Sequence, residues 1–117
     1  RMIKYLLPFL LLSFNAYSAC LDDAYTTVDM MDCYTEELKV EGQKLEDTLT
    51  KAYKDSDWVA NEIRLSQEAW MKYREAHCNA IYTSYGRGTM RLIAYPSCMV
   101  RLTKQRTEGL QRSFTNP

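Results

Sequence analysis

The sequence lacks most of the features that would point to a metal enzyme, a β-sheet or a membrane span. It has four cysteines and one histidine, and no two cysteines have the spacing of two to four residues that zinc sites use. We therefore expect no metal site and no cofactor. After the first 18 residues there is no apolar run near the roughly 20 residues that a spanning helix needs. No alternation of apolar and polar residues is long enough to predict a sheet.

The sequence has helical periodicity instead. Apolar residues recur at steps of three and four, which predicts helices over about 27–53 and 58–82 and a third helix that begins at Pro96. The stretch Met90–Tyr95 is interpreted as irregular. The simplest arrangement is all-α, a small antiparallel three-helix bundle stapled by two disulfides.

Two helix starts have recognisable caps. The Thr26 hydroxyl is expected to accept a hydrogen bond in the first turn of the first helix. Asp29, three positions later, gives a spacing like that of a capping box. Asp57 is expected to cap the second helix.

The segment from Trp70 to Cys78 is the predicted centre of the fold. Its large side chains and two from the first helix are interpreted as the structural core or seam: Trp70, Tyr73, Arg74, Leu49 and Tyr53. We expect Arg74 to pair with an acid such as Asp29 or Glu46. The alternative is that an arginine beside aromatic rings receives a carboxylate or a sugar from a ligand.

The first 18 residues are predicted to be a signal peptide. Lys4 supplies the positive charge, a short apolar run follows, and small residues at Ala16 and Ser18 fit cleavage after Ser18. Arg1 precedes the expected start at Met2 and is interpreted as not native. The predicted mature domain is therefore residues 19–117.

The net charge of the predicted mature domain and the residues before Cys20 limit the classes of partner that we expect. Removing residues 1–18 removes two basic residues and no acid, which leaves 13 basic and 15 acidic residues and a net charge of −2. This balance argues against nucleic acid or an anionic membrane surface as a partner. Tyr17, three residues before Cys20, stands where a lipobox prefers an aliphatic residue, so lipid anchoring through Cys20 is disfavoured.

The four cysteines are predicted to form two disulfides, because an even count after a signal peptide is typical of an oxidising compartment. They are Cys20, Cys33, Cys78 and Cys98. In the predicted bundle all four lie at the same end. The preferred pairing is Cys33 with Cys78 and Cys20 with Cys98, although the sequence permits three connectivities.

Several segments together resemble a known family. They are Thr26–Met30 between Cys20 and Cys33, then Leu49–Tyr53, Gln67–Cys78, Gly86–Met90, and Cys98 followed by Thr103, Arg106 and Leu110. This ordered set resembles the LprI-like family of small secreted bacterial proteins, related to the N-terminal domain of the lysozyme inhibitor LprI. The resemblance implies an all-helical, disulfide-bonded, periplasmic or secreted protein. It supplies no inhibitory residues, and Arg87 separates two glycines that are adjacent in the family.

The loop before the third helix is the predicted partner-binding site. Tyr85, Arg87 and Arg91 are cationic or aromatic, and such residues form interface hot spots. A projecting Arg87 could enter a lysozyme cleft and pair with its two acidic catalytic groups. The alternative is a plain connection between helices.

No enzymatic activity is expected. His77 is the single histidine and has no evident nucleophile beside it in the sequence, and the acids lie on predicted solvent-facing helix surfaces beside lysines. The first hypothesis is a secreted or periplasmic helical binding protein that inhibits a lysozyme by occluding its cleft. The alternative is an envelope accessory, adaptor or toxin-immunity protein with no effect on lysozyme.

Overall fold

Three long helices make up the fold. The computed structural model describes residue 22 and residues 24–117; the predicted signal peptide and Cys20 lie outside these residues. The elements are α2 (Thr27–Asp55), the 3-10 turn η3 (Asp57–Val59), α3 (Ala60–Ser84) and α4 (Met90–Phe114). No strand occurs in this described part of the chain, so the all-α prediction is confirmed. None of these helices is both long enough and apolar enough to cross a membrane.

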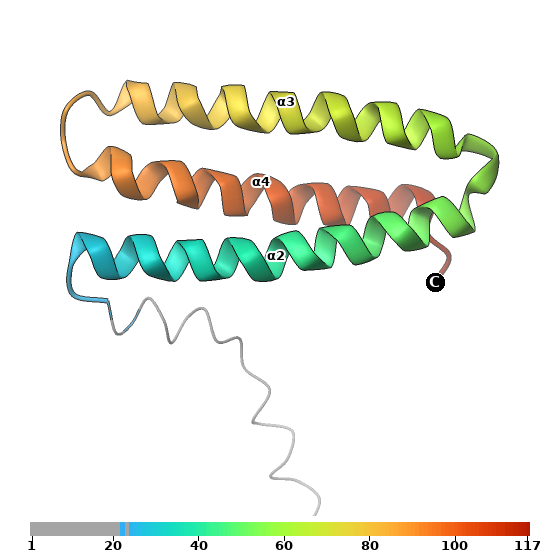
Figure 1. Ribbon diagram of the computed structural model, residues 1–117, viewed down its shortest axis with the longest axis horizontal. Helices are drawn as coiled ribbons and strands as arrows, with labels where there is room; N and C mark the ends of the chain where they lie inside the picture. Colours follow the sequence, from blue (N-terminus) through green and yellow to red (C-terminus); the bar gives the residue numbers. More distant parts are fainter. Residues whose placement is uncertain (1–21, 23) are drawn as a thin grey trace, which may run out of the picture.

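The last helix, α4, lies between the other two (Figure 1). It runs parallel to α2 and antiparallel to α3, and α2 meets α3 mainly near η3. We call the end of the molecule with η3 the turn end. The opposite end, where the loop Tyr85–Thr89 joins α3 to α4, is the loop end.

The predicted cap of the first helix is present, but that of the second is wrong. Thr26 Oγ1 accepts a hydrogen bond from the Asp29 N–H at 3.0 Å, and Asp29 Oδ2 accepts one from the Tyr25 N–H at 3.2 Å. Asp57 does not cap α3, since it is the first residue of η3 and the N-cap of α3 is Val59. The cause lies one residue earlier, where the Ser56 hydroxyl donates to the Phe114 carbonyl at 2.8 Å and ties the turn to the end of α4.

The helix α4 begins six residues earlier than predicted. Met90–Tyr95 is helical, and Pro96 lies inside the helix rather than at its start. An interior proline costs roughly 3 kcal/mol and removes one backbone hydrogen bond. Residues 91–97 are all at least half-buried, so packing of this segment offsets the cost.

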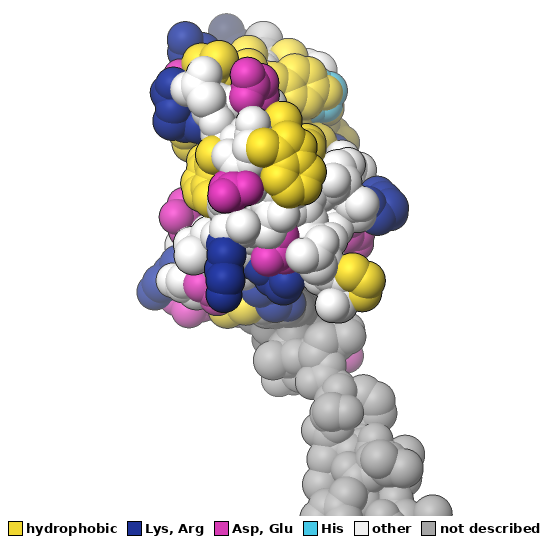
Figure 2. Space-filling view, turned by 90° about the vertical axis from the view of Figure 1, so that its right-hand side faces the viewer, with side chains coloured by type: hydrophobic (Ala, Val, Ile, Leu, Met, Phe, Trp, Pro, Cys, Tyr) yellow, Lys and Arg dark blue, Asp and Glu magenta, His cyan; other side chains and the backbone are white. Residues whose placement is uncertain are grey.

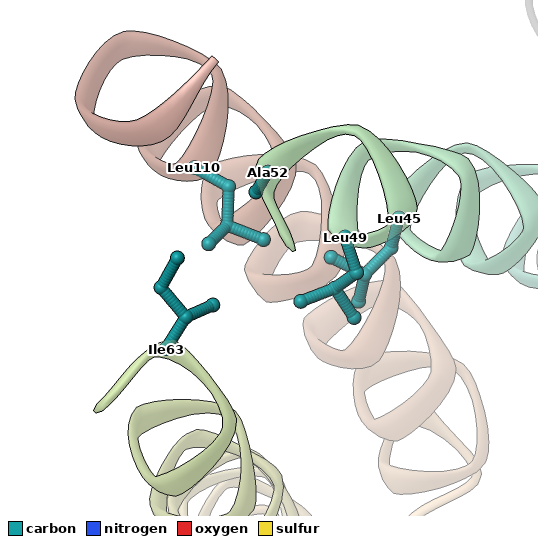
Figure 3. Packing of buried hydrophobic residues seen from close by; sticks show 5 residues of the cluster. All are labelled: Leu45, Leu49, Ala52, Ile63 and Leu110. Atoms are coloured by element: carbon teal, nitrogen blue, oxygen red, sulfur yellow. The ribbon is translucent and has the colours of Figure 1, made fainter. Parts of the chain in front are cut away.

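The turn-end cluster is the part of the core shared by all three helices. It consists of Leu45, Leu49 and Ala52 of α2, Ile63 of α3 and Leu110 of α4, whose side chains point toward one another (Figure 3). Four partly buried residues pack around it: Tyr53, Val59, Trp70 and Phe114. Leu49 thus lies in the core and Tyr53 packs against it, as the sequence pattern predicted.

A second cluster lies nearer the loop end. Its buried members are Cys78, Cys98, Met99 and Leu102. Trp70 packs against both clusters and so connects them. Along α2 the predicted apolar stripe is interrupted, because Glu37 and Glu41 are each only 4% exposed. Lys104 of α4 pairs with Glu37 at 3.0 Å, and Lys44 pairs with Glu41 at 3.3 Å, which compensates the buried charges.

The disulfide pairing differs from the prediction. Cys78 bonds to Cys98, with their Cα atoms 5.6 Å apart, so the pairs Cys33–Cys78 and Cys20–Cys98 are wrong. The reason is the order of the helices: α4, and not α2, lies beside α3 at this end. Two disulfides were predicted, and one, Cys78–Cys98, is seen in the described residues. Cys33 is buried and is not a free thiol.

The C-terminal segment is clasped by the end of α2. Asp55 Oδ2 accepts hydrogen bonds from the Lys51 ammonium and, at 2.8 Å, from the Asn116 N–H. Lys51 Nζ also donates to the Asn116 carbonyl at 3.1 Å. The Lys51 hydrogen bond and the Asn116 N–H lower the pKa of Asp55 below its ordinary value, against a smaller opposing effect of burial.

We expect Asp55→Asn to destabilise the protein at neutral pH and to have little effect in acid. A carboxyl group whose pKa is lowered by folding contributes stability above its unfolded pKa of about 3.9 and loses it as the pH falls through the lowered value. Urea unfolding of both proteins at about pH 7 and about pH 2.5 measures this. The exposed Asp57→Asn is the control, and an equal loss at both pH values would contradict the charge-based explanation.

Candidate protein-binding site at the loop end

The loop Tyr85–Thr89 is an ordered turn. The Tyr85 N–H donates to the Tyr82 carbonyl at 3.3 Å, and the Gly86 N–H donates to the Thr83 carbonyl at 3.0 Å, which closes the end of α3. Gly86 has φ of +68°, the left-handed conformation that glycine adopts without strain at helix ends. The Arg91 N–H bonds back to the Gly88 carbonyl at 3.4 Å, so both sides of the loop are held.

Arg91 braces this loop rather than projecting from it. Its Nη1 donates to the Gly86 carbonyl at 3.3 Å, and its guanidinium carbon lies 5.1 Å from the centre of the Tyr82 ring. Tyr82 in turn meets Tyr95 edge-on, with ring centres 6.3 Å apart. Of the three predicted contact residues, Arg91 is therefore half-buried and internal to the site, while Tyr85 and Arg87 are exposed.

Arg87 is the exposed charged residue of the loop. Its side chain has no hydrogen bond or ion pair with any residue that the structure describes. The sequence around it holds no acid from Ala76 to Thr107 but five basic residues: Arg87, Arg91, Arg101, Lys104 and Arg106. This acid-free stretch was not predicted to matter, although the sequence shows it directly. Arg87 itself is thus suited to bind a carboxylate through charge-assisted hydrogen bonds.

The turn end has a different character. Figure 2 shows acidic and basic side chains interspersed there, with hydrophobic groups between them. Trp58 of η3 is strongly exposed, and the Lys51–Asp55 ion pair lies near the same end. Because both signs of charge alternate, this surface does not select a partner of one charge.

The predicted centre of the fold, Trp70 and Arg74, forms a network between α3 and α4. The guanidinium carbons of Arg74 and Arg106 lie 4.8 Å and 6.0 Å from the Trp70 ring centre. Arg74 Nη1 donates to Thr103 Oγ1, and Arg106 donates to Gln67 Oε1 and Ser66 Oγ, each at 2.8 Å. The acceptor of Arg74 is thus a hydroxyl and not the expected carboxylate of Asp29 or Glu46.

This network is structural. Burial lowers the pKa of Arg74, which the negative charge of Glu75 opposes, and burial likewise lowers the pKa of Arg106. Both guanidiniums remain charged at neutral pH, because arginine does not lose its proton in proteins. Each of them has a neutral hydrogen-bond acceptor. They therefore fasten α3 to α4 by hydrogen bonds where α3 contributes few buried apolar side chains.

Tyr73 was predicted to lie in the seam, and this is wrong. It is 53% exposed and stacks on His77, with ring centres 5.3 Å apart. Tyr73 lies about 100° around the helix from Arg74. Only α4 covers this part of α3, so the seam is too narrow to include it.

Comparison with known proteins decides the family. The family model described as "Lysozyme inhibitor LprI" matches residues 18–110. The chain belongs to the LprI lysozyme inhibitor family. The part matched by the LprI model includes the disulfide, the Trp70 network and the loop Tyr85–Thr89, and it ends at Leu110 in the turn-end cluster. No curated protein and no solved structure gave a match.

Proposed function

We propose that the protein is a secreted or periplasmic lysozyme inhibitor that occludes the muramidase cleft with its loop end. Membership of the LprI family supports a lysozyme as the protein partner. The observation that carries the proposal is Arg87, an exposed and unpaired cation on a hydrogen-bonded loop at the tip of a helical rod. The protein acts by binding and not by catalysis.

The chemistry of the two partners is complementary. Glycosidases of this kind place two carboxyl groups on either side of the bond that they cut. An arginine that enters such a cleft forms charge-assisted, often bidentate, hydrogen bonds with a carboxylate. Because Gly86, Gly88 and Arg91 already fix the loop, little backbone conformational entropy remains to be lost on binding. Tyr85 is 49% exposed beside Arg87 and adds an aromatic contact.

We expect Arg87→Ala to weaken inhibition by about 10- to 100-fold, the range of an interface hot spot. The measurement is the inhibition constant of the oxidised protein against several lysozyme types. Arg112→Ala is the matched control, because Arg112 is also exposed on a helix but lies at the turn end. It should inhibit like the unchanged protein.

Two results would count against the proposal. Full inhibition by Arg87→Ala would remove the loop from the binding site while leaving the lysozyme partner in place. No inhibition of any lysozyme type by the unchanged protein would overturn the inhibitor function and favour the accessory or adaptor role.

A further inference from the structure

We propose that an apolar groove beside the loop is a second contact of the same interface and receives an apolar side chain from the lysozyme. This rests on the proposed function. The groove has a volume of about 310 Å³ and is lined by Met31 and Leu38 of α2, Tyr82 of α3, and Leu92, Pro96 and Met99 of α4. It is at the lower end of ligand-pocket sizes, about 300–1,000 Å³, so it fits a few side chains.

The groove follows from the order of the helices. At the turn end α2 and α3 approach each other, and Leu49, Ile63 and Leu110 fill the space between the three helices. Toward the loop end α2 and α3 have no shared interface, and α4 forms a floor between them. Apart from Met99, which is buried, the apolar side chains on that floor are left half-covered. Covering them with a partner would remove apolar area from water, at about 25 cal/mol per Å².

Two features of the lining suit it to a partner side chain. Met31 and Met99 are flexible and polarisable, so they adapt to the shape of an incoming group. Pro96 has no N–H, so the Leu92 carbonyl lacks the donor that a regular helix would supply from that position. Leu92 and Pro96 both line the groove, so this turn of α4 belongs to its floor.

Charge indicates what flanks the apolar side chain. Tyr82 lines the groove and carries the Arg91 guanidinium on its ring, and the loop with Arg87 follows directly. No acid occurs in residues 76–107. Tyr95 also lines the groove, and its hydroxyl donates to Glu75 at 3.4 Å. The acids of the α2 side are Asp32 and Glu36, which follow the lining residues Met31 and Thr35 in the sequence. On its loop side, where Arg91 and Arg87 follow, the groove therefore fits a partner surface that presents an apolar side chain next to a carboxylate.

The native methionines allow a direct test. We expect the ¹³C-labelled methyl resonances of Met31 and Met99 to shift when lysozyme is added. Met71, on the outer face of α3, is the internal control and should not shift.

A groove-filling substitution supplies the functional test. Thr35→Phe places a ring at the groove, where Thr35 is exposed and its hydroxyl bonds only to the Met31 carbonyl. We expect at least about 10-fold weaker inhibition, as for an interface hot spot. Thr50→Phe is the matched control, since Thr50 is exposed on the same helix and makes the same bond to the Glu46 carbonyl.

The outcomes separate the two proposals. Shifts of the Met31 and Met99 methyl resonances, together with weaker inhibition by Thr35→Phe but not by Thr50→Phe, support the groove as a contact with lysozyme. Unchanged methyl resonances and full inhibition by Thr35→Phe, while Arg87→Ala is impaired, overturn the groove and leave the inhibitor function standing. If the unchanged protein binds no lysozyme, the proposed function fails, and lysozyme as the occupant of the groove fails with it.

Discussion

Removal of the Cys78–Cys98 disulfide is expected to lower the free energy of unfolding by about 3 kcal/mol. The bond closes a loop with a sequence separation of 20, and loops of that length lose about this much entropy in the unfolded chain when they are cross-linked. Both cysteines should be replaced by alanine together, so that no single thiol remains to form a wrong bond. Urea unfolding of the double variant and the unchanged oxidised protein measures the difference.

The loss should be concentrated in the second half of α3. Its buried residues are Ile63 and Gln67 near the turn end and then only Cys78, so the disulfide is the main buried attachment of the loop-end half. In the double variant, hydrogen exchange of residues 74–84 should rise more than exchange in α2. A loss below about 1 kcal/mol would show instead that the hydrogen bonds of Arg74 and Arg106 are enough to hold α3.

Leu110→Ala is expected to cost about 3–5 kcal/mol, the range for fully buried leucines. Leu110 is 0% exposed, and Figure 3 shows it between Ala52 of α2 and Ile63 of α3. Truncation leaves a cavity where all three helices meet, and none of them can move into it without losing contact with another. For a small domain this is a large share of total stability.

The matched control for that variant is Leu65→Ala. Leu65 is 50% exposed on α3, so its truncation should change the free energy of unfolding by no more than about 0.5 kcal/mol. Urea unfolding midpoints of the two variants at one temperature provide the comparison. Similar costs for the two leucines would mean that the turn-end cluster is not the centre of stability.

The parts of the fold that follow from local rules were predictable. Periodicity located the first two helices to within a few residues, and the Thr26 cap could be predicted because it depends only on residues four positions apart or fewer. The start of α4 could not, because the local cost of Pro96 is overcome by packing against other helices. The pairing of Cys78 with Cys98 depends on which helix lies in the middle, and periodicity does not show which helices are neighbours.

The candidate site likewise has a part that was predictable from the sequence and a part that was not. The exposure of Arg87 followed from its place between two glycines, which is a local property. The brace formed by Arg91 and the groove were not predicted, because they join residues from separate helices whose types are those of an ordinary core. Glu37 was assigned to the solvent-facing side for a related reason, since the compensating Lys104 lies on a different helix.

The central helix, α4, is synthesised after the two helices that it joins. A chain that emerges from its amino-terminal end first has α2 and α3 available before α4, yet those two helices share contacts mainly near η3. Until α4 is present, the inner faces of α2 and α3 are uncovered over most of their length. Formation of the bundle therefore depends on the segment that follows both outer helices in the sequence.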